Sequence, residues 1–247
     1  MIFFAETDKG KRRRMNQDYV YGTDQPIGAL DDLFLLADGM GGHKAGDYAS
    51  RYLVEELKKY FGNTSSGPVV RLLQKGIESI NAELYRLSRE NESLSGMGTT
   101  LVAAVIEQEV MTVANIGDSR CYLIHGNTIR QITRDHSYVE EMVERGMMRR
   151  GSPEYLRARN IITRAVGIEP TVEADFFEID LSEGDFVLLC SDGLFNMVDN
   201  ESILSIVRDD SSIQDKGRAL IDMANINGGR DNIGVVLIDP FHKEVTE

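Results

Sequence analysis

The sequence predicts an α+β fold in which helices pack on the outer faces of β-sheets. Short apolar runs bounded by Gly, Asp or Asn recur along the chain, as expected for strands. Two long helical patterns adjoin each other near the middle and a third lies near the end, so strands and helices do not alternate regularly. No repeat and no linker-like change of composition interrupts the 247 residues, and we therefore expect one domain over residues 1–247.

Apolar side chains at helical spacing predict three helices, over residues 46–61, 69–88 and 213–225. In the first helix the apolar residues recur every four positions: Ala49, Leu53, Leu57 and Phe61. In the second helix the spacing alternates between three and four residues, which is typical of a buried stripe. We expect these side chains to lie in the core.

The remaining apolar runs are short and are predicted to be strands. They cover residues 2–7, 19–22, 33–37, 99–106, 110–116, 120–124, 172–179, 186–190 and 233–238. The gap between the fourth and fifth runs has the length of a hairpin turn.

Composition excludes some classes of function. The chain has 27 Lys and Arg against 40 Asp and Glu, and its net charge of −13 argues against nucleic-acid binding. An anionic substrate is still compatible, because bound metal ions would invert the local charge. No apolar run approaches the ~20 residues that a membrane span needs, so we expect no membrane insertion. Two cysteines cannot form a disulfide framework, which favours a reducing, cytoplasmic setting.

Acidic residues stand at the ends of several predicted strands: Asp18, Asp38, Asp118, Asp192 and Asp231. Each one alone is readily explained as a turn residue. If the five carboxylates converge, their repulsion must be relieved by protons or metal ions. Oxygen ligands suit Mg²⁺ or Mn²⁺, and two such ions about 3.5–4 Å apart form a clamp for displacement at phosphorus. Spacing in the sequence does not show whether they converge.

These acids belong to motifs that follow one another in a fixed order. The motifs are Arg13-Arg14-Met15-Asn16-Gln17-Asp18, Ala37-Asp38-Gly39-Met40-Gly41-Gly42-His43, Gly96-Met97-Gly98-Thr99-Thr100, Asn115-Ile116-Gly117-Asp118-Ser119-Arg120, Asp135-His136-Ser137, Ser191-Asp192-Gly193-Leu194 and Gly229-Arg230-Asp231-Asn232-Ile233. In this order they resemble the metal-dependent Ser/Thr protein phosphatases of type 2C, and most closely the compact bacterial members. The resemblance extends over essentially the whole chain.

The resemblance implies a four-layer α/β/β/α sandwich of two antiparallel sheets with helices outside. It implies that phosphoserine and phosphothreonine in proteins are hydrolysed by a hydroxide activated at two Mn²⁺ or Mg²⁺ ions. Such an enzyme would counteract a Ser/Thr protein kinase in signalling. It also implies a flap subdomain, about residues 134–164, beside the active site. That segment is rich in arginine with interspersed acids, so it is either a solvated helical flap or one that helps to select phosphoproteins.

Position by position, the resemblance implies that Asp38 bridges the two core ions and that the carbonyl of Gly39 binds one of them. Asp192 and Asp231 would complete the other ion. The glycine would let the backbone approach the metal closely.

Three further roles follow from the same resemblance. Asp18 would hold water at the metal, Asp118 would help to bind a possible third ion, and Arg13 would grip the substrate phosphate. Two residues depart from the family pattern: Gln17 stands where many members have Glu, and Met40 where many eukaryotic members have a His proposed as general acid. A thioether cannot donate a proton, so the general acid is left open.

Two other functions compete with an active phosphoprotein phosphatase. The first is a catalytically weak module that binds phosphoproteins, although such a member would be expected to lose a metal-bridging acid. The second is a hydrolase of small phosphoesters on the same scaffold, since the metal chemistry is the same. We expect a monomer, a hydrogen-bonding rather than catalytic role for His136, and buried, unreactive side chains for Cys121 and Cys190.

Overall fold

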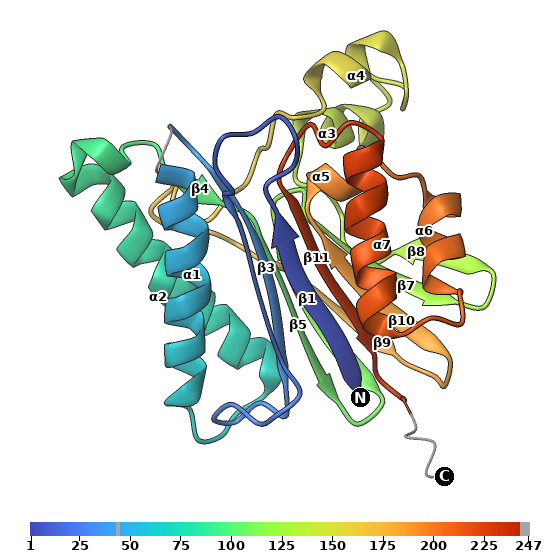
Figure 1. Cartoon of the computed structure of the whole chain (residues 1–247). Coiled ribbons are helices and arrows are strands. Elements are labelled where there is room, and N and C mark those ends of the chain that lie inside the picture. Colours follow the sequence, from blue (N-terminus) through green and yellow to red (C-terminus); the bar gives the residue numbers. More distant parts are fainter. Residues whose placement is uncertain (43–44, 243–247) are drawn as a thin grey trace.

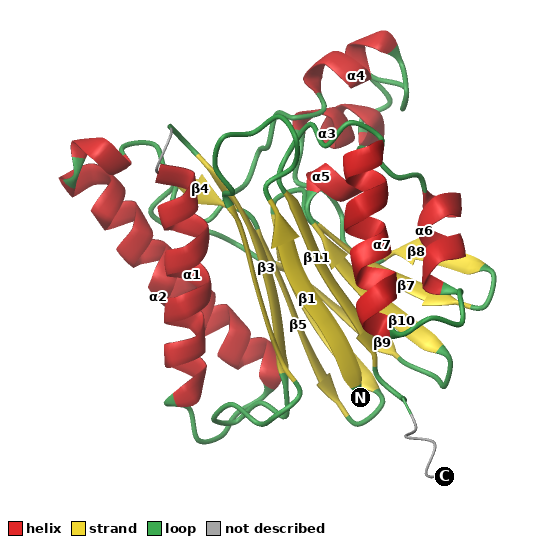
Figure 2. Cartoon of the chain, viewed as in Figure 1, coloured by secondary structure: helices red, strands yellow, loops and turns green. Residues whose placement is uncertain are grey.

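The computed structural model describes residues 1–42 and 45–242, and His43 of the second motif therefore lies outside the described residues. Two antiparallel β-sheets pack face to face, and helices cover the outer face of each sheet (Figure 1 and Figure 2). The arrangement is the four-layer α/β/β/α sandwich that the family resemblance implied. Among the described residues, no helix has the length and apolar character needed to cross a membrane.

One sheet has five strands, and each neighbouring pair in it is antiparallel. Its spatial order is β1 (Ile2–Asp8), β11 (Ile233–Asp239), β10 (Asp185–Cys190), β7 (Arg120–His125) and β8 (Thr128–Gln131). The first and last strands of the chain pair along their whole lengths, with Ile2 opposite Asp239. This pairing joins the two ends of the described chain within one sheet.

The other sheet also pairs its strands antiparallel. Its order is β2 (Asp18–Thr23), β3 (Leu33–Met40), β5 (Leu101–Glu107), β6 (Val110–Ile116) and β9 (Asp175–Asp180), with the short β4 (Gly98–Thr99) beside β3. The predicted hairpin is present: Glu107 pairs with Val110, and Gln108 in the turn has a φ of 58°.

Helices cover the two outer faces (Figure 1). The helices α1 (Ala45–Gly62) and α2 (Val69–Glu90) bury their apolar stripes against β2, β3 and β5, and the single turn η1 (Glu92–Leu94) follows them. The helices α5 (Asp192–Phe195), α6 (Asn200–Val207) and α7 (Ile213–Ile226) pack against the five-stranded sheet. Helices over residues 46–61, 69–88 and 213–225 are thus confirmed within one or two residues.

Alternation along the strands produces three apolar cores. In β3, Leu33 and Leu35 face the helices α1 and α2, whereas Phe34 and Leu36 face the other sheet. All four side chains are fully buried. Strands buried on both faces read as continuous apolar runs, which is why the sequence revealed them.

The sequence did not reveal the shorter and more polar elements. These are the strands β4 and β8 and the helices α5 and α6, whereas the helical character expected of the 134–164 segment is present as α3 (Tyr138–Glu144) and α4 (Pro153–Ala158). Each is too short to establish an apolar period. The strand predicted over residues 172–179 begins only at Asp175, because Val172 and Ala174 pack as loop residues beside the outer core of α1 and α2.

Candidate active site

Five acidic residues reach the same end of the sandwich, the end at which α5 begins; α5 lies toward the top of Figure 1. Asp18 opens β2 and lies directly opposite Asp38 of β3 in the strand register. Asp192 follows β10 and begins α5, Asp231 precedes β11, and Asp118 lies in the loop from β6 to β7. We call these five residues the acidic cluster. Antiparallel order brings them together from both sheets, which the sequence spacing could not show.

Burial and mutual repulsion perturb the centre of the acidic cluster. Burial raises the pKa of Asp38 well above its usual range, and the carboxylates of Asp18, Asp192, Asp118 and Asp231 raise it further. A site with this electrostatic character stabilises either bound protons or bound cations.

Asp18 is buried and is held by one hydrogen bond. Ser191 Oγ donates to Asp18 Oδ2 at 2.6 Å, while Asp18 Oδ1 has no hydrogen-bond partner in the part of the chain that the structure describes. Burial raises the pKa of Asp18 to about 7, against the lowering effect of the Ser191 hydrogen bond. An orphaned buried carboxylate oxygen is costly in a protein, so it indicates a missing partner such as a cation or its water.

The pKa values of Asp118 and Asp192 are perturbed in the same direction. Burial raises the pKa of Asp118 to about 7 and that of Asp192 to about 6, with added repulsion from Asp192 on the first and from Asp231 on the second. Arg13, Arg159 and Arg120 act on Asp192 in the opposite direction. The cluster therefore repels itself across both sheets.

Asp231 is different because it already has a cationic neighbour. Arg13 Nη2 donates to Asp231 Oδ2 at 2.6 Å, and the backbone N–H of Asn232 donates to Asp231 Oδ1 at 2.9 Å. The structure thus brings the expected phosphate-gripping arginine to the expected metal ligand.

The acidic cluster offers oxygen donors, which are the ligands that hard divalent ions prefer. Within residues 1–42 and 45–242, no three His, Cys, Asp or Glu side chains are grouped so that they alone could hold an ion. The structure therefore does not gather Asp38, Asp192 and Asp231 around one point, and Asp231 is drawn toward Arg13 instead. Mg²⁺ typically keeps several waters and takes one or two carboxylates, so a cluster of separated oxygen donors with an unpartnered oxygen fits it.

Gly39 follows Asp38 at a point where backbone segments converge. A Cβ atom at Gly39 would lie 2.0 Å from the carbonyl oxygen of Gly46, in the first turn of α1. Only glycine can stand here without displacing α1. Gln17 reaches the same turn, because a Cβ at Gly46 would lie 2.3 Å from Gln17 Nε2. The amide that replaces the family's Glu therefore packs against the start of α1.

Hydroxyl groups that sequence reasoning assigned no role hold Asp38 in place. Thr100 Oγ1 accepts from the Asp38 N–H at 2.9 Å, and Thr99 Oγ1 donates to the Asp38 carbonyl at 3.0 Å. Thr100 Oγ1 also lies 2.7 Å from Ser119 Oγ, beside Asp118. The available signal was the Thr99-Thr100 pair in a recognised motif, but its function depends on the pairing of β4 with β3.

Asn232 is a second positioning residue that the sequence left without a role. Its Nδ2 donates to the carbonyls of Lys9 and Met15, both at 2.8 Å, and its Oδ1 accepts from the Gln17 N–H at 2.9 Å. One buried amide therefore fixes the loop between β1 and β2 against the head of β11. Arg13 projects from that loop.

The loop that carries Asp118 is clamped by His136. Gly117, whose φ is 101°, donates its N–H to His136 Nδ1 at 3.0 Å and accepts from the His136 N–H at 2.9 Å. Because Nδ1 accepts, Nε2 carries the proton and faces Asp175 Oδ2 at 3.2 Å. Burial lowers the pKa of His136. The expected hydrogen-bonding role of His136 is confirmed.

The flap segment, residues 134–164, stands over the acidic cluster. A cavity of about 130 Å³ lies between them, lined among others by Asp118 and Asp192 from the core and by Tyr155, Arg159 and Asn160 from the flap. Met40 lines a different cavity, of about 360 Å³. The other lining residues lie between positions 162 and 173, at the end of the flap and directly after it. The acidic residues among the described residues that line this cavity are Glu169 and Glu173.

Most flap arginines are paired within the protein. Arg150 and the Tyr155 hydroxyl both contact Glu140, and Arg134 pairs with Glu144. These ion pairs are as expected for a solvated flap. Arg159 differs because it lines the 130 Å³ cavity, where an arginine would suit a role in selecting substrates.

The two thiols lie in apolar cores, Cys190 in that of the outer helices α6 and α7 and Cys121 in that between the sheets. Cys121 and Cys190 are free, fully buried and set in β7 and β10. Burial raises the pKa of Cys190 to about 12 and raises the pKa of Cys121 as well. Neither side chain is a nucleophile at neutral pH, as the sequence predicted.

Comparison with known proteins gives consistent matches. A family model described as protein phosphatase 2C matches residues 8–225. A serine/threonine phosphatase of Listeria monocytogenes serotype 4b, named stp, is 38% identical over 241 residues, which cover 94% of this chain and 93% of that protein.

Solved structures are similar over the same extent. The serine/threonine phosphatase of S. agalactiae superposes with a TM-score of 0.88 at 34% identity, covering 96% of this chain and 98% of that one. The catalytic domain of the serine/threonine phosphatase PstP, solved with two manganese ions, gives a TM-score of 0.83 at 33% identity, covering 96% and 97%.

Proposed function

The chain belongs to the protein phosphatase 2C family and is a metal-dependent serine/threonine phosphatase, and we propose that the acidic cluster is its metal centre. The observation that carries the proposal is the environment of Asp38. This half-buried carboxylate lies near four others, and its raised pKa marks a site that would be stabilised by a bound cation. When bound, Mn²⁺ or Mg²⁺ supplies Lewis acidity and activates water for attack on phosphorus.

We propose that Asp38 would hold both core ions, as their bridging ligand, and that Gly39 would offer its carbonyl oxygen to one of them. Asp192 and Asp231 would hold the other. The Asp231 Oδ2 atom is shared between two candidate partners, the ion and Arg13, at 2.6 Å from the latter. An exchange of partners would free the guanidinium of Arg13 to grip the phosphate oxygens of the substrate.

The remaining acids take supporting roles in the proposal. Asp18, with one oxygen held by Ser191 and the other unpartnered, orients water at the centre. Asp118, on the loop clamped by His136, contributes to a third ion site together with Asp192, at the 130 Å³ cavity under the flap. The general acid stays open, because Met40 cannot donate a proton.

We also propose that the chain acts as a monomer in the cytoplasm, opposite a Ser/Thr protein kinase. All residues of the proposed centre come from one chain, so no second copy is needed to complete it. Both thiols are unpaired, which suits a reducing compartment.

The test of the function is phosphate release from a phosphothreonine peptide with Mn²⁺ and in EDTA. We expect turnover with Mn²⁺, none in EDTA, and full activity in a Cys121→Ser/Cys190→Ser variant. Activity that persists in EDTA would contradict metal-dependent chemistry at the acidic cluster.

A further inference from the structure

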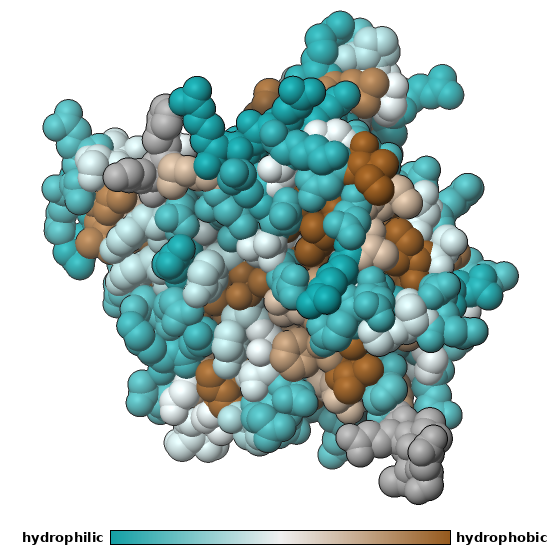
Figure 3. All heavy atoms as spheres, viewed as in Figure 1, coloured by the Kyte–Doolittle hydropathy of each residue, from teal (hydrophilic) through white to brown (hydrophobic). Residues whose placement is uncertain are grey.

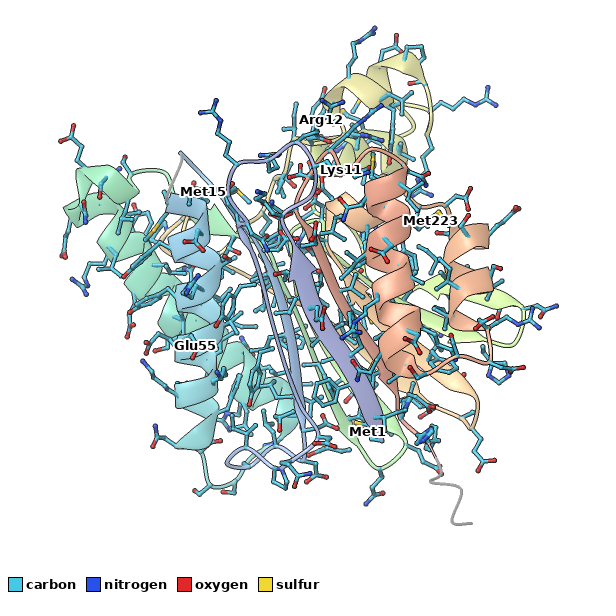
Figure 4. The ribbon with its side chains drawn as sticks, in the orientation of Figure 1. Met1, Lys11, Arg12, Met15, Glu55 and Met223 are labelled. Carbon is cyan, nitrogen blue, oxygen red and sulfur yellow. The ribbon has the colours of Figure 1, made fainter. Side chains whose placement is uncertain are left out.

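A concentrated group of cations stands at the edge of the proposed centre. The loop between β1 and β2 carries five of them in six positions: Lys9, Lys11, Arg12, Arg13 and Arg14. We call residues 9–14 the basic loop. It contrasts with the chain as a whole, whose net charge is −13. The loop crosses the upper end of the molecule, where Figure 4 labels Lys11 and Arg12 and where Figure 3 shows hydrophilic atoms.

The charges of the basic loop are mostly uncompensated. Arg13 pairs with Asp231, whereas the side chains of Lys9, Lys11, Arg12 and Arg14 form no ion pair with any residue that the structure describes. All four are exposed. Elsewhere on the surface, cations such as Lys59 and Arg86 pair with acids on their own helices. Like charges at neighbouring positions repel, so this loop stabilises a bound anion.

The backbone beneath these charges is firmly anchored. The N–H groups of Lys11 and Arg12 donate to the Gly229 carbonyl at 2.8 and 3.1 Å, and Asn232 binds the carbonyls of Lys9 and Met15. A Cβ at Gly10, where φ is 73°, would lie 2.1 Å from the Asp231 carbonyl oxygen. The loop is therefore held against the segment that carries Asp231. A fixed backbone lowers the entropic cost of binding a ligand, because only the side chains of the loop have to be ordered.

Position within the loop defines what could bind. Arg12 and Arg14 are the immediate neighbours of Arg13, and Lys11 is two residues away. Residues of an extended substrate peptide are about 3.3–3.6 Å apart. The side chains that flank Arg13 can therefore reach an anion on the substrate that lies one to three residues from the phosphoryl group gripped by Arg13. A second phosphoryl group is the anion that fits best, since it carries a charge of about −1.5 to −2 and accepts bidentate hydrogen bonds from guanidinium.

We propose that Lys11, Arg12 and Arg14 form a subsite for a second phosphoryl group, so that the preferred substrates are protein segments phosphorylated at closely spaced positions. The subsite rests on the proposed function, because it is defined by its distance from Arg13 and the metal centre. It offsets the repulsion that a chain of net charge −13 exerts on a multiply charged substrate.

The experiment compares three phosphothreonine peptides of one sequence. Two residues from the phosphothreonine they carry alanine, glutamate, or a non-hydrolysable phosphonate analogue of phosphoserine, so only the phosphothreonine releases phosphate. We expect wild-type kcat/KM to be about tenfold to a hundredfold higher for the phosphonate peptide than for the alanine peptide, as befits one or two charge-assisted contacts.

Two triple variants identify the source of that preference. Lys11→Gln/Arg12→Gln/Arg14→Gln should abolish it while leaving turnover of the alanine peptide and of p-nitrophenyl phosphate unchanged. The control variant, Arg71→Gln/Lys75→Gln/Arg208→Gln, should keep the preference. It removes three exposed cations from α2 and the end of α6, and these also form no ion pair with any residue that the structure describes.

Three results would overturn the subsite. They are a wild-type enzyme that does not prefer the phosphonate peptide, an equal acceleration by glutamate, or an equal loss of preference in both triple variants. Failure of the proposed function would look different, because no peptide and no p-nitrophenyl phosphate would then be hydrolysed in a Mn²⁺-dependent manner. Binding of the phosphonate peptide, followed by fluorescence anisotropy, gives a readout that does not depend on turnover.

Discussion

Asp118 is the residue whose role most needs a test of its own. It is buried, and its carboxylate is repelled by Asp192, yet it stands on the loop after β6 rather than in the strand pair that holds Asp18 and Asp38. We predict that Asp118→Asn leaves the two core ions bound and sharply reduces turnover. Calorimetric Mn²⁺ titration beside phosphopeptide kinetics measures both effects. Unimpaired turnover at low Mn²⁺, or loss of all metal binding, would reject a separate third-ion role.

His136 acts on Asp118 through the backbone of Gly117. His136→Ala leaves the buried Gly117 N–H without an acceptor, which should cost about 1–3 kcal/mol and displace the loop. We predict about tenfold lower turnover in this variant, with the two core ions retained, as for a loss of roughly 1.4 kcal/mol of transition-state stabilisation. His136→Asn carries an oxygen near the position of Nδ1 and should restore most of the activity. Equal damage in both variants would show that the clamp on Gly117 is not the cause.

The flap is an element with its own internal contacts. Glu140 of α3 is buried and accepts from Arg150 and from the Tyr155 hydroxyl at 2.8 Å, which joins α3 to α4. We predict that Glu140→Gln speeds proteolysis and hydrogen exchange between residues 138 and 158 without lowering the melting temperature of the core. The reason is that α3 and α4 lie outside the three apolar cores that hold the sheets and outer helices.

A matched control comes from the same flap. Glu154 pairs with Arg157, but both side chains are largely exposed, at 62% and 71% of their full area. Such surface pairs contribute little, so Glu154→Gln should leave flap exchange at the wild-type rate. If the two variants behave alike, the buried Glu140 contact does not organise the flap.

The elements also show how far a sequence alone can be taken. The strand β3 and the helices α1, α2 and α7 were predictable because each buries a continuous or periodic apolar surface. The helix α6 was not, although its N-cap is clear in the structure, where Asp199 accepts from the Ser202 N–H at 2.8 Å. A cap gives the start of a helix but no period, and this helix has only two turns.

At the scale of the site, residue types were predictable and proximity was not. Asp18 and Asp38 are twenty residues apart, and only the antiparallel register of β2 with β3 sets them side by side. The Arg13–Asp231 contact spans almost the entire chain and depends on β1 pairing with β11. Thr100, Ser191 and Asn232 became recognisable as positioning residues only after both sheets were assembled.

The stability of the whole molecule should depend on pH through Asp32. This residue immediately precedes β3, at the opposite end of the strand from Asp38. Burial raises its pKa from 3.8 to about 7, although the Ile106 N–H donates to it at 2.8 Å. Between about pH 4 and 7 the unfolded chain releases this proton while the folded protein keeps it, so the free energy of unfolding falls as pH rises. Below that window Asp32 is protonated in both states.

We therefore predict that Asp32→Asn, which can still accept from Ile106, raises the melting temperature at pH 8 by at least about 2 °C and has little effect at pH 4. Thermal unfolding at constant Mn²⁺ measures the difference. The control variant Asp210→Asn removes an exposed carboxylate that does not act on Asp32, and it should show no such change. A uniform shift of Asp32→Asn across all pH values would attribute the effect to packing instead.

The central claim, that the acidic cluster binds the catalytic ions through Asp38, is tested most directly by Mn²⁺ titration of the wild-type protein and of Asp38→Ala by calorimetry. The account predicts that the wild-type protein binds both core ions and that Asp38→Ala binds neither, while its circular dichroism stays native because a repelling carboxylate has been removed. Wild-type Mn²⁺ binding in folded Asp38→Ala would contradict it.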